Sequence, residues 1–128
     1  MIEYIDPSGI ALAAATYSHV VKVTNATQIF VAGQVALDEN GRIVGIRDIE
    51  QQTHQALQNI RACLEAAGAS MNDVIYRTTY VTSMDDCHKI FAIWPQYFDH
   101  LPPGTLLQVT SLYPKDAMIE IEVTAVID

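Results

Sequence analysis

The run from Met118 to Ile127 constrains the fold of this chain more than any other segment, because its side chains alternate in character. Every second residue is apolar and falls on one face: Ile119, Ile121, Val123, Ala125 and Ile127. This period of two predicts a β-strand with one buried face. Glu120 and Glu122 share the other face, roughly 7 Å apart at about 3.3 Å of rise per residue. Two like charges at this spacing repel, and no arginine or lysine lies within four residues of either. The acidic face therefore needs water, a cation or a function.

Four more segments have the β-branched, aromatic and alternating character of strands. They are Tyr17 to Val23, Gln28 to Leu37, Val74 to Thr82, and Thr105 to Ser111. The residues Asn25 to Thr27 suit a short turn, so we expect the first two of these strands to form a hairpin.

Two helices separate the later strands. Asp48 is suited to cap the first helix, and Gly68 supplies its left-handed end. The second helix begins near Asp85 or Asp86. Pro95 lacks an amide hydrogen, so we expect it to kink or restart that helix.

The resulting order is β-β-α-β-α-β-β, with room for a small extra N-terminal strand. It predicts an α+β fold, a mixed sheet with two helices packed on one face. A length of 128 residues favours a single domain spanning 1–128. The strand from Val74 to Thr82 is apolar or amphipathic on both faces, and two helices cover only one of them. We therefore expect a self-associating oligomer to cover the second face.

Composition excludes several classes of protein. Seven basic residues against fifteen acidic ones give a formal charge of −8, which argues against nucleic-acid binding and attachment to anionic membranes. Apolar runs are too short for a membrane span, and the N-terminus lacks the positive region of a signal peptide, so a cytoplasmic protein is expected. The four histidines show no metal-ligand spacing, and no nucleotide-binding motif occurs, so we expect neither a metal nor a cofactor.

Several blocks resemble one known family in order from residue 17 to the C-terminus. They are Tyr17 to His19, Ile29 to Gln34, Asp48 to Thr53, Ala56 to Ile60, Leu64 to Gly68, Arg77 to Val81, Pro114 to Asp116, and Ile119 to Glu122. Through them the chain resembles the Rid (YjgF, RidA) family of small imine and enamine deaminases. The resemblance implies a chorismate-mutase-like fold and a homotrimer with ligand clefts between subunits. It also implies cofactor-free hydrolysis of reactive 2-imino or 2-enamino acids, products of pyridoxal-phosphate enzymes, to 2-keto acids and ammonia.

The resemblance also implies roles for individual residues. Glu120 stands where the family has its water-positioning, catalytic glutamate, while Tyr17 and the backbone around Gly33 would line the cleft. The family's carboxylate-binding arginine is missing: Gly104 stands at its position, and no arginine follows Arg77. Losing a charge-assisted partner costs about 2 kcal/mol or more, at least tenfold in affinity.

Other substitutions fall in the same implied cleft. Phe91 stands where relatives often carry asparagine. We expect Gly104 to widen the cleft for a bulkier ligand, and Thr105 to replace part of the lost anchor with its hydroxyl.

Each candidate also has an ordinary structural interpretation. The structural interpretation of Glu120 is a solvated or lysine-paired strand residue, and Glu122 is expected to be structural. Arg77 or Lys115 would be the partner of either glutamate in that interpretation. Tyr17 would then be a half-buried strand tyrosine, and Gly33 a bulge. Two further residues are interpreted as packed thiols, Cys63 in the core and Cys87 at the start of the second helix.

Three functions remain open from the sequence. The first is a divergent imine or enamine deaminase, with 2-aminomuconate-type substrates included. The second is a non-catalytic trimeric protein that binds a small metabolite in the retained cleft. The third is a ribonuclease, against which the charge of −8 argues.

Overall fold

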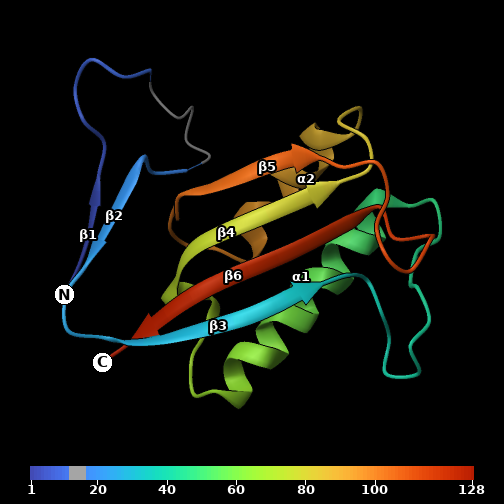
Figure 1. Cartoon of the computed structure of the whole chain (residues 1–128), viewed down its shortest axis with the longest axis horizontal. Helices are drawn as coiled ribbons and strands as arrows, with labels where there is room; N and C mark the ends of the chain where they lie inside the picture. Colours follow the sequence, from blue (N-terminus) through green and yellow to red (C-terminus); the bar gives the residue numbers. More distant parts are fainter. Residues whose placement is uncertain (12–16) are drawn as a thin grey trace.

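The computed structural model describes residues 1–11 and 17–128 (Figure 1). Its strands are β1 (Ile2–Ile5), β2 (Val20–Val23), β3 (Thr27–Gln34), β4 (Val74–Val81), β5 (Gly104–Gln108) and β6 (Ile119–Ile127). Its α-helices are α1 (Ile49–Ala66) and α2 (Cys87–Ile93), and two short 3-10 helices span Met71–Asp73 and Trp94–Gln96.

The main sheet has the strand order β3-β6-β4-β5. Strand β6 runs antiparallel to both neighbours, whereas β4 and β5 are parallel because α2 connects them as a crossover. The apolar face predicted for β6 is confirmed, since Ile119, Ile121, Val123 and Ala125 are all buried. Its position in the interior of the sheet explains why one face had to be apolar along its length.

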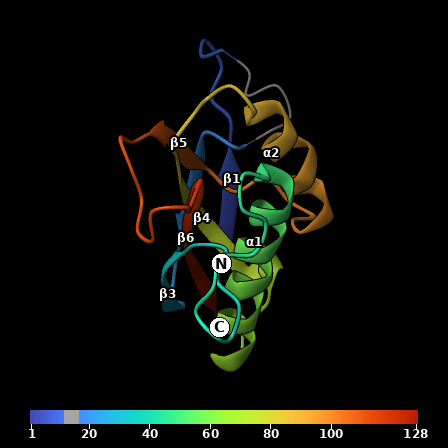
Figure 2. The ribbon, with the colours of Figure 1, turned by 90° about the vertical axis from the view of Figure 1, so that its right-hand side faces the viewer.

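Both α-helices pack on the same face of this sheet, as Figure 2 shows. The side chain of Asp48 accepts a hydrogen bond of 3.1 Å from the amide of Gln51, so the predicted N-cap of α1 is confirmed. Gly68 follows α1 with a φ of +80°, as predicted for its left-handed end. The predicted interruption at Pro95 is also confirmed, because α2 ends at Ile93 and continues as a 3-10 turn. The mixed α+β fold with two helices on one face is therefore the one that the sequence predicted.

The predicted hairpin between the first two strands is wrong. Strand β2 pairs with β1, the small N-terminal strand, in a separate two-stranded sheet beside the main one (Figure 1). Strand β3 pairs instead with β6, which places Val31 opposite Val123 over the core. A turn sequence alone does not determine strand pairing when pairing with a strand distant in sequence buries more apolar surface.

The face of the sheet away from the helices is open. Phe30 on β3 is 73% exposed there, and Tyr76 on β4 is 40% exposed. Between them lie Glu122 and Thr124 of β6, in a shallow depression that Phe30 and Tyr76 also line. In the described part of the chain, no helix is long and apolar enough to cross a membrane.

Candidate functional site

Gly33 and Glu120 are in direct contact on neighbouring strands. The pairing of β3 with β6 shifts register between Val31 and Gln34, which marks a bulge at Gly33. A Cβ atom on Gly33 would lie only 2.4 Å from Oε2 of Glu120 and 2.9 Å from its Cδ. The Glu120 carboxylate thus rests over the backbone of Gly33, and only glycine leaves room for it.

Tyr80 and Glu122 adjoin this pair on the same face. Tyr80 stands opposite Glu120 in the β4–β6 register, and its hydroxyl donates a hydrogen bond to Glu122. That hydrogen bond, with smaller contributions from desolvation and the charges of Glu122 and Glu120, raises the pKa of Tyr80. This partner favours the structural interpretation of Glu122 and leaves the Glu120 carboxylate beside a polar pair.

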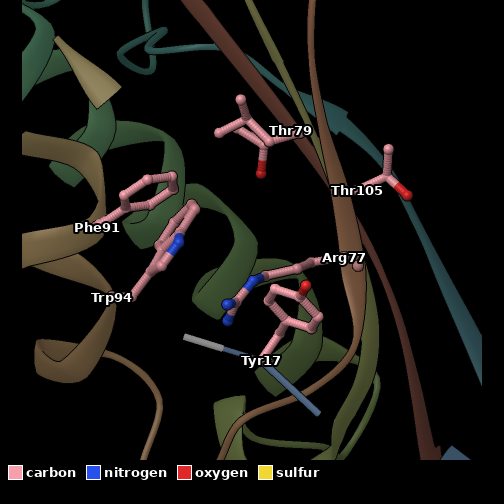
Figure 3. Close-up of a pocket in the computed structure, with 8 residues that line it drawn as sticks. Tyr17, Arg77, Thr79, Phe91, Trp94 and Thr105 are labelled. Carbon is pink, nitrogen blue, oxygen red and sulfur yellow. The ribbon is translucent and has the colours of Figure 1, made fainter. Parts of the chain in front are cut away.

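A cavity of about 130 Å³ lies on the opposite, helical face of the sheet (Figure 3). Tyr17, Arg77, Thr79, Phe91, Trp94, Gly104, Thr105 and Leu106 line it. Four of the residues predicted to bind substrate are thus together: Tyr17, Phe91, Gly104 and Thr105. The sequence prediction did not include Arg77, Thr79, Trp94 or Leu106 in this group.

Arg77 supplies the positive charge of this cavity. Its side chain extends from β4 toward Trp94 (Figure 3) and is 6% exposed. The guanidinium carbon lies 4.7 Å from the ring centre of Trp94 and 5.0 Å from that of Phe98, within the range of cation–π contacts. Burial lowers the pKa of Arg77 to about 10, which leaves the guanidinium charged at neutral pH.

The suggested pairing of Arg77 with Glu120 or Glu122 is wrong, because these side chains lie on opposite faces of the sheet. Alternation along β4 buries Arg77 and Thr79 under the helices and turns Tyr80 toward the glutamates. The same alternation is visible in the sequence from Val74 to Thr82, and it was the available signal that Arg77 faces the helices.

The expectation that Gly104 widens the cavity is also wrong. Gly104 stands opposite Arg77 in the parallel β4–β5 register. A Cβ atom there would lie 2.1 Å from the carbonyl oxygen of Arg77 and 2.9 Å from its Cγ. The space that a side chain would need at position 104 is therefore filled by Arg77 itself.

Tyr17 and Thr105 occupy the rim of the cavity in different ways. The amide of Ser18 donates a 2.9 Å hydrogen bond to the carbonyl of Leu101, which holds Tyr17 near the start of β5. The hydroxyl of Thr105 lies 3.0 Å from that of Tyr76 on the open face. The backbone of Thr105 therefore faces the cavity, whereas its hydroxyl contacts Tyr76 on the open face.

The predicted site residues fall into two groups within one chain. Glu120 is level with Tyr80, whereas Gly104 is level with Arg77, three residues earlier on β4. The two positions are separated by roughly 10 Å along the strands and roughly 10 Å across them. The Gly33–Glu120 pair and the Arg77 cavity also face opposite ways, so a single chain does not join them into one small site.

Several of the histidines that the structure describes make contacts other than metal coordination. Among the residues that the structure describes, no group of three or more His, Cys, Asp or Glu side chains is arranged to hold a metal ion. His54, for example, contacts the Tyr97 hydroxyl at 2.8 Å, and His100 contacts the Val74 carbonyl at 2.6 Å.

The chain matches known proteins over nearly its whole length. Residues 9–127 match the family model described as Endoribonuclease L-PSP. A RutC family protein of Pyrococcus horikoshii is 44% identical over 110 residues, which cover 85% of each chain. The Escherichia coli protein named reactive intermediate deaminase TdcF is 33% identical over 105 residues, which cover 78% of this chain and 79% of that protein.

Solved structures extend this likeness to the fold. A Yersinia pestis protein of the conserved Rid family, YyfB, superposes with a TM-score of 0.87 at 31% identity, covering 98% of both chains. The Escherichia coli TdcF structure with bound serine superposes with a TM-score of 0.73 at 28% identity, covering 94% of this chain and all of that one. The described fold is thus the fold of these proteins.

Proposed function

Because this chain belongs to the Rid (YjgF) family, we propose that it hydrolyses a reactive imine or enamine to a carbonyl compound and ammonia. The observation that carries the proposal is the contact between Gly33 and Glu120, where a glycine backbone makes room for one carboxylate. The name of the relative TdcF as a reactive intermediate deaminase supports the reaction class. No cofactor is part of the proposed reaction.

The reaction asks little of the protein. Glu120 orients a water molecule and accepts one of its protons while the water oxygen bonds to the imine carbon. The imine nitrogen takes up a proton from solvent, which gives a tetrahedral carbinolamine. Glu120 then passes its proton to the amine nitrogen, the hydroxyl releases its proton to solvent as the carbonyl forms, and the carbon–nitrogen bond breaks with its electron pair leaving on ammonia. An enamine substrate first takes a proton on carbon and releases one from nitrogen to become the imine.

The two groups of site residues support a site shared between copies of the chain. We place Gly33 and Glu120 of one subunit against the Arg77 cavity of its neighbour in the homotrimer that the family resemblance implies. The open face of the sheet, with Phe30 and Tyr76 exposed, supplies apolar surface for such an assembly. The serine in the TdcF crystal structure supports a ligand of amino-acid size.

The direct test generates 2-iminobutanoate or 2-aminoacrylate in situ with a pyridoxal-phosphate dehydratase and follows release of the keto acid. We expect the protein to accelerate release over the uncatalysed rate, and a 2-aminomuconate-type substrate belongs in the same panel. No acceleration for any of these substrates would overturn the proposal for them.

Co-expression of two variants, each altered in one half of the site, tests the shared site. In a random one-to-one mixture of Arg77→Lys and Glu120→Ala chains, about one quarter of the interfaces combine an intact cavity with an intact glutamate. At a substrate concentration where each variant alone is slow, we expect the mixed trimers to be faster than either variant. Mixed trimers that are no faster than the separate variants would contradict a site built from two subunits.

Non-catalytic binding of a small metabolite is the second candidate function. Phe91 supports it, since an aromatic ring lines the cavity where a polar side chain is expected from the resemblance. Ligand binding without any acceleration of imine hydrolysis would favour this candidate over the enzyme.

The description of the family model raises a third possibility, RNA cleavage. The formal charge of −8 argues against it, because RNA binding depends on basic side chains that neutralise phosphates. RNA cleavage that persists through purification and is abolished by Glu120→Ala would reverse this judgement.

A further inference from the structure

Arg77 and Gly104 fit one another in a way that no arginine at position 104 would allow. They are direct partners in the β4–β5 register, and the aliphatic stem of Arg77 occupies the space beside Gly104. A Cβ atom at 104 would lie 2.9 Å from Cγ of Arg77 and 2.1 Å from its backbone oxygen. The chain therefore has one arginine in this cavity, and it enters from β4 instead of β5.

The surroundings of Arg77 make its guanidinium a strong anion binder. Buried charges interact strongly because little water screens them, and bonds from a guanidinium to a carboxylate are charge-assisted. The guanidinium carbon lies over the rings of Trp94 and Phe98, and these two cation–π contacts restrict the positions that the guanidinium can take. A guanidinium presents its N–H donors in a planar fork, and two of them match the two oxygens of a carboxylate.

We propose that Arg77 is the carboxylate anchor of this chain, and that its cavity selects small, flat carboxylates. The inference that such a ligand is hydrolysed rests on the proposed function. Its binding to Arg77 does not, because binding is measured without turnover. Arg77 thus acts as a substrate-binding residue, and Glu120 of the neighbouring subunit acts on the bound molecule.

The shape and lining of the cavity point to a flat ligand. Rings from three residues, Tyr17, Phe91 and Trp94, contribute to its walls, and Leu106 adds an aliphatic surface. Its volume of about 130 Å³ accommodates a small carboxylic acid, and an adjoining space of about 360 Å³ shares Arg77, Phe91 and Trp94 with it. A conjugated carboxylate, such as a 2-enamino acid, offers a planar π-system to these rings and one carboxylate to Arg77. A saturated amino acid of the same size offers a carboxylate but no planar π-system.

The single tryptophan of the chain makes the test direct. Trp94 lines the cavity and stacks on Arg77, so its fluorescence reports ligand binding. Three probes of matched size separate charge from shape: crotonate is flat and anionic, butyrate is anionic and flexible, and crotonamide is flat and neutral. We expect crotonate to bind more tightly than either of the others.

Arg77→Lys keeps the positive charge and removes the planar fork, and we expect it to weaken crotonate binding at least about tenfold. Arg61→Lys is the matched control, because the Arg61 guanidinium also lies over a ring, 4.9 Å from the centre of Tyr97, but outside this cavity. It should leave crotonate affinity unchanged. Equal crotonate affinity in the Arg77→Lys variant and the unmodified protein would overturn the proposal.

Circular dichroism identifies an Arg77→Lys protein that fails to fold, and Phe91→Leu then provides the test. Phe91 is 41% exposed, so this change removes a ring from the wall with little effect on the core. We expect the preference for crotonate over butyrate to fall. An unchanged preference would refute the selection of flat ligands.

Failure of this inference and failure of the proposed function give different results. Crotonate binding that depends on Arg77, in a protein without deaminase activity, would support Arg77 as the carboxylate anchor and refute the proposed reaction. Deaminase activity with the same KM in the Arg77→Lys variant would refute Arg77 as the anchor and support the proposed reaction.

Discussion

Replacing Gly33 with alanine tests the central contact of the proposed site. The added Cβ would lie 2.4 Å from Oε2 of Glu120, whereas ordinary contacts begin at 3.4 Å, so the carboxylate must move by about 1 Å (3.4 − 2.4). The atom that must move is the end of a flexible side chain, which makes the displacement inexpensive for the fold. A displacement of about 1 Å in a catalytic group can lower the rate about 100-fold.

The expected result is therefore a loss of activity without a loss of stability. We expect kcat for imine hydrolysis to fall about 100-fold in Gly33→Ala. The free energy of unfolding, measured in urea, should stay the same or rise by up to about 1 kcal/mol, since alanine is less flexible than glycine in the unfolded chain. Gly41→Ala is the matched control. Gly41 has a φ of +77° and open space around its Cα, so alanine there should cost about 1 kcal/mol of stability and leave kcat unchanged.

A double variant shows whether position 33 acts through the glutamate. If alanine at 33 only displaces the carboxylate, Gly33→Ala combined with Glu120→Ala should be as slow as Glu120→Ala alone. Full activity in Gly33→Ala would refute the proposal that alanine at 33 displaces the Glu120 carboxylate. A double variant about 100-fold slower than Glu120→Ala would refute it as well.

Three further changes have expected outcomes that follow from single contacts. Gly104→Ala places a Cβ 2.1 Å from the Arg77 carbonyl oxygen, so β5 must shift and the free energy of unfolding should fall by about 1–3 kcal/mol; an unchanged urea midpoint would contradict this contact. Tyr80→Phe should remove a tyrosine whose phenol keeps its proton above the usual pKa of about 10, because hydrogen bonding to Glu122 raises the pKa of Tyr80. The absorbance difference between the two proteins at 295 nm should therefore appear only at higher pH, and a difference that develops below pH 10 would disprove the raised pKa. Desolvation, followed by the charges of Asp86 and Asp85, raises the pKa of Cys87. In a Cys63→Ala background, Cys87 should therefore react with iodoacetamide more slowly than a free thiol does at pH 7. Its reaction should become faster above the usual thiol pKa of about 8.5. Rapid alkylation at pH 7 would count against that environment.

Local signals in the sequence predicted the fold well. The alternation along β6 identified a strand with one buried face, and the Asp48 and Gly68 signals located the ends of α1. Each of these depends on residues within one element. The prediction of a β2–β3 hairpin was wrong because burial of Val31 over the core favours pairing of β3 with β6. These two strands are far apart in the sequence, so the turn residues at Asn25 carry no information about their pairing.

The sequence identified some of the residues that line the cavity but not the geometry that brings them together. Four of the residues that the resemblance implicated do line one cavity. Alternation along β4 puts Arg77 on the same face as Thr79, but the local sequence did not show that the helices cover this face or that Trp94 lies over the guanidinium. The sequence also did not show that Arg77 fills the space beside Gly104, because these residues lie on two strands that α2 separates in the chain.

The most direct test of the account compares two glutamates on one strand face. Keto-acid release from an enzymatically generated imine is measured for the unmodified protein, for Glu120→Ala and for Glu122→Ala. Glu122 is the matched control, because it has the same charge two residues away and is held by Tyr80. We expect Glu120→Ala to lose the acceleration and Glu122→Ala to keep most of it. Equal activity in Glu120→Ala and the unmodified protein would contradict the assignment of Glu120 as the residue that activates water.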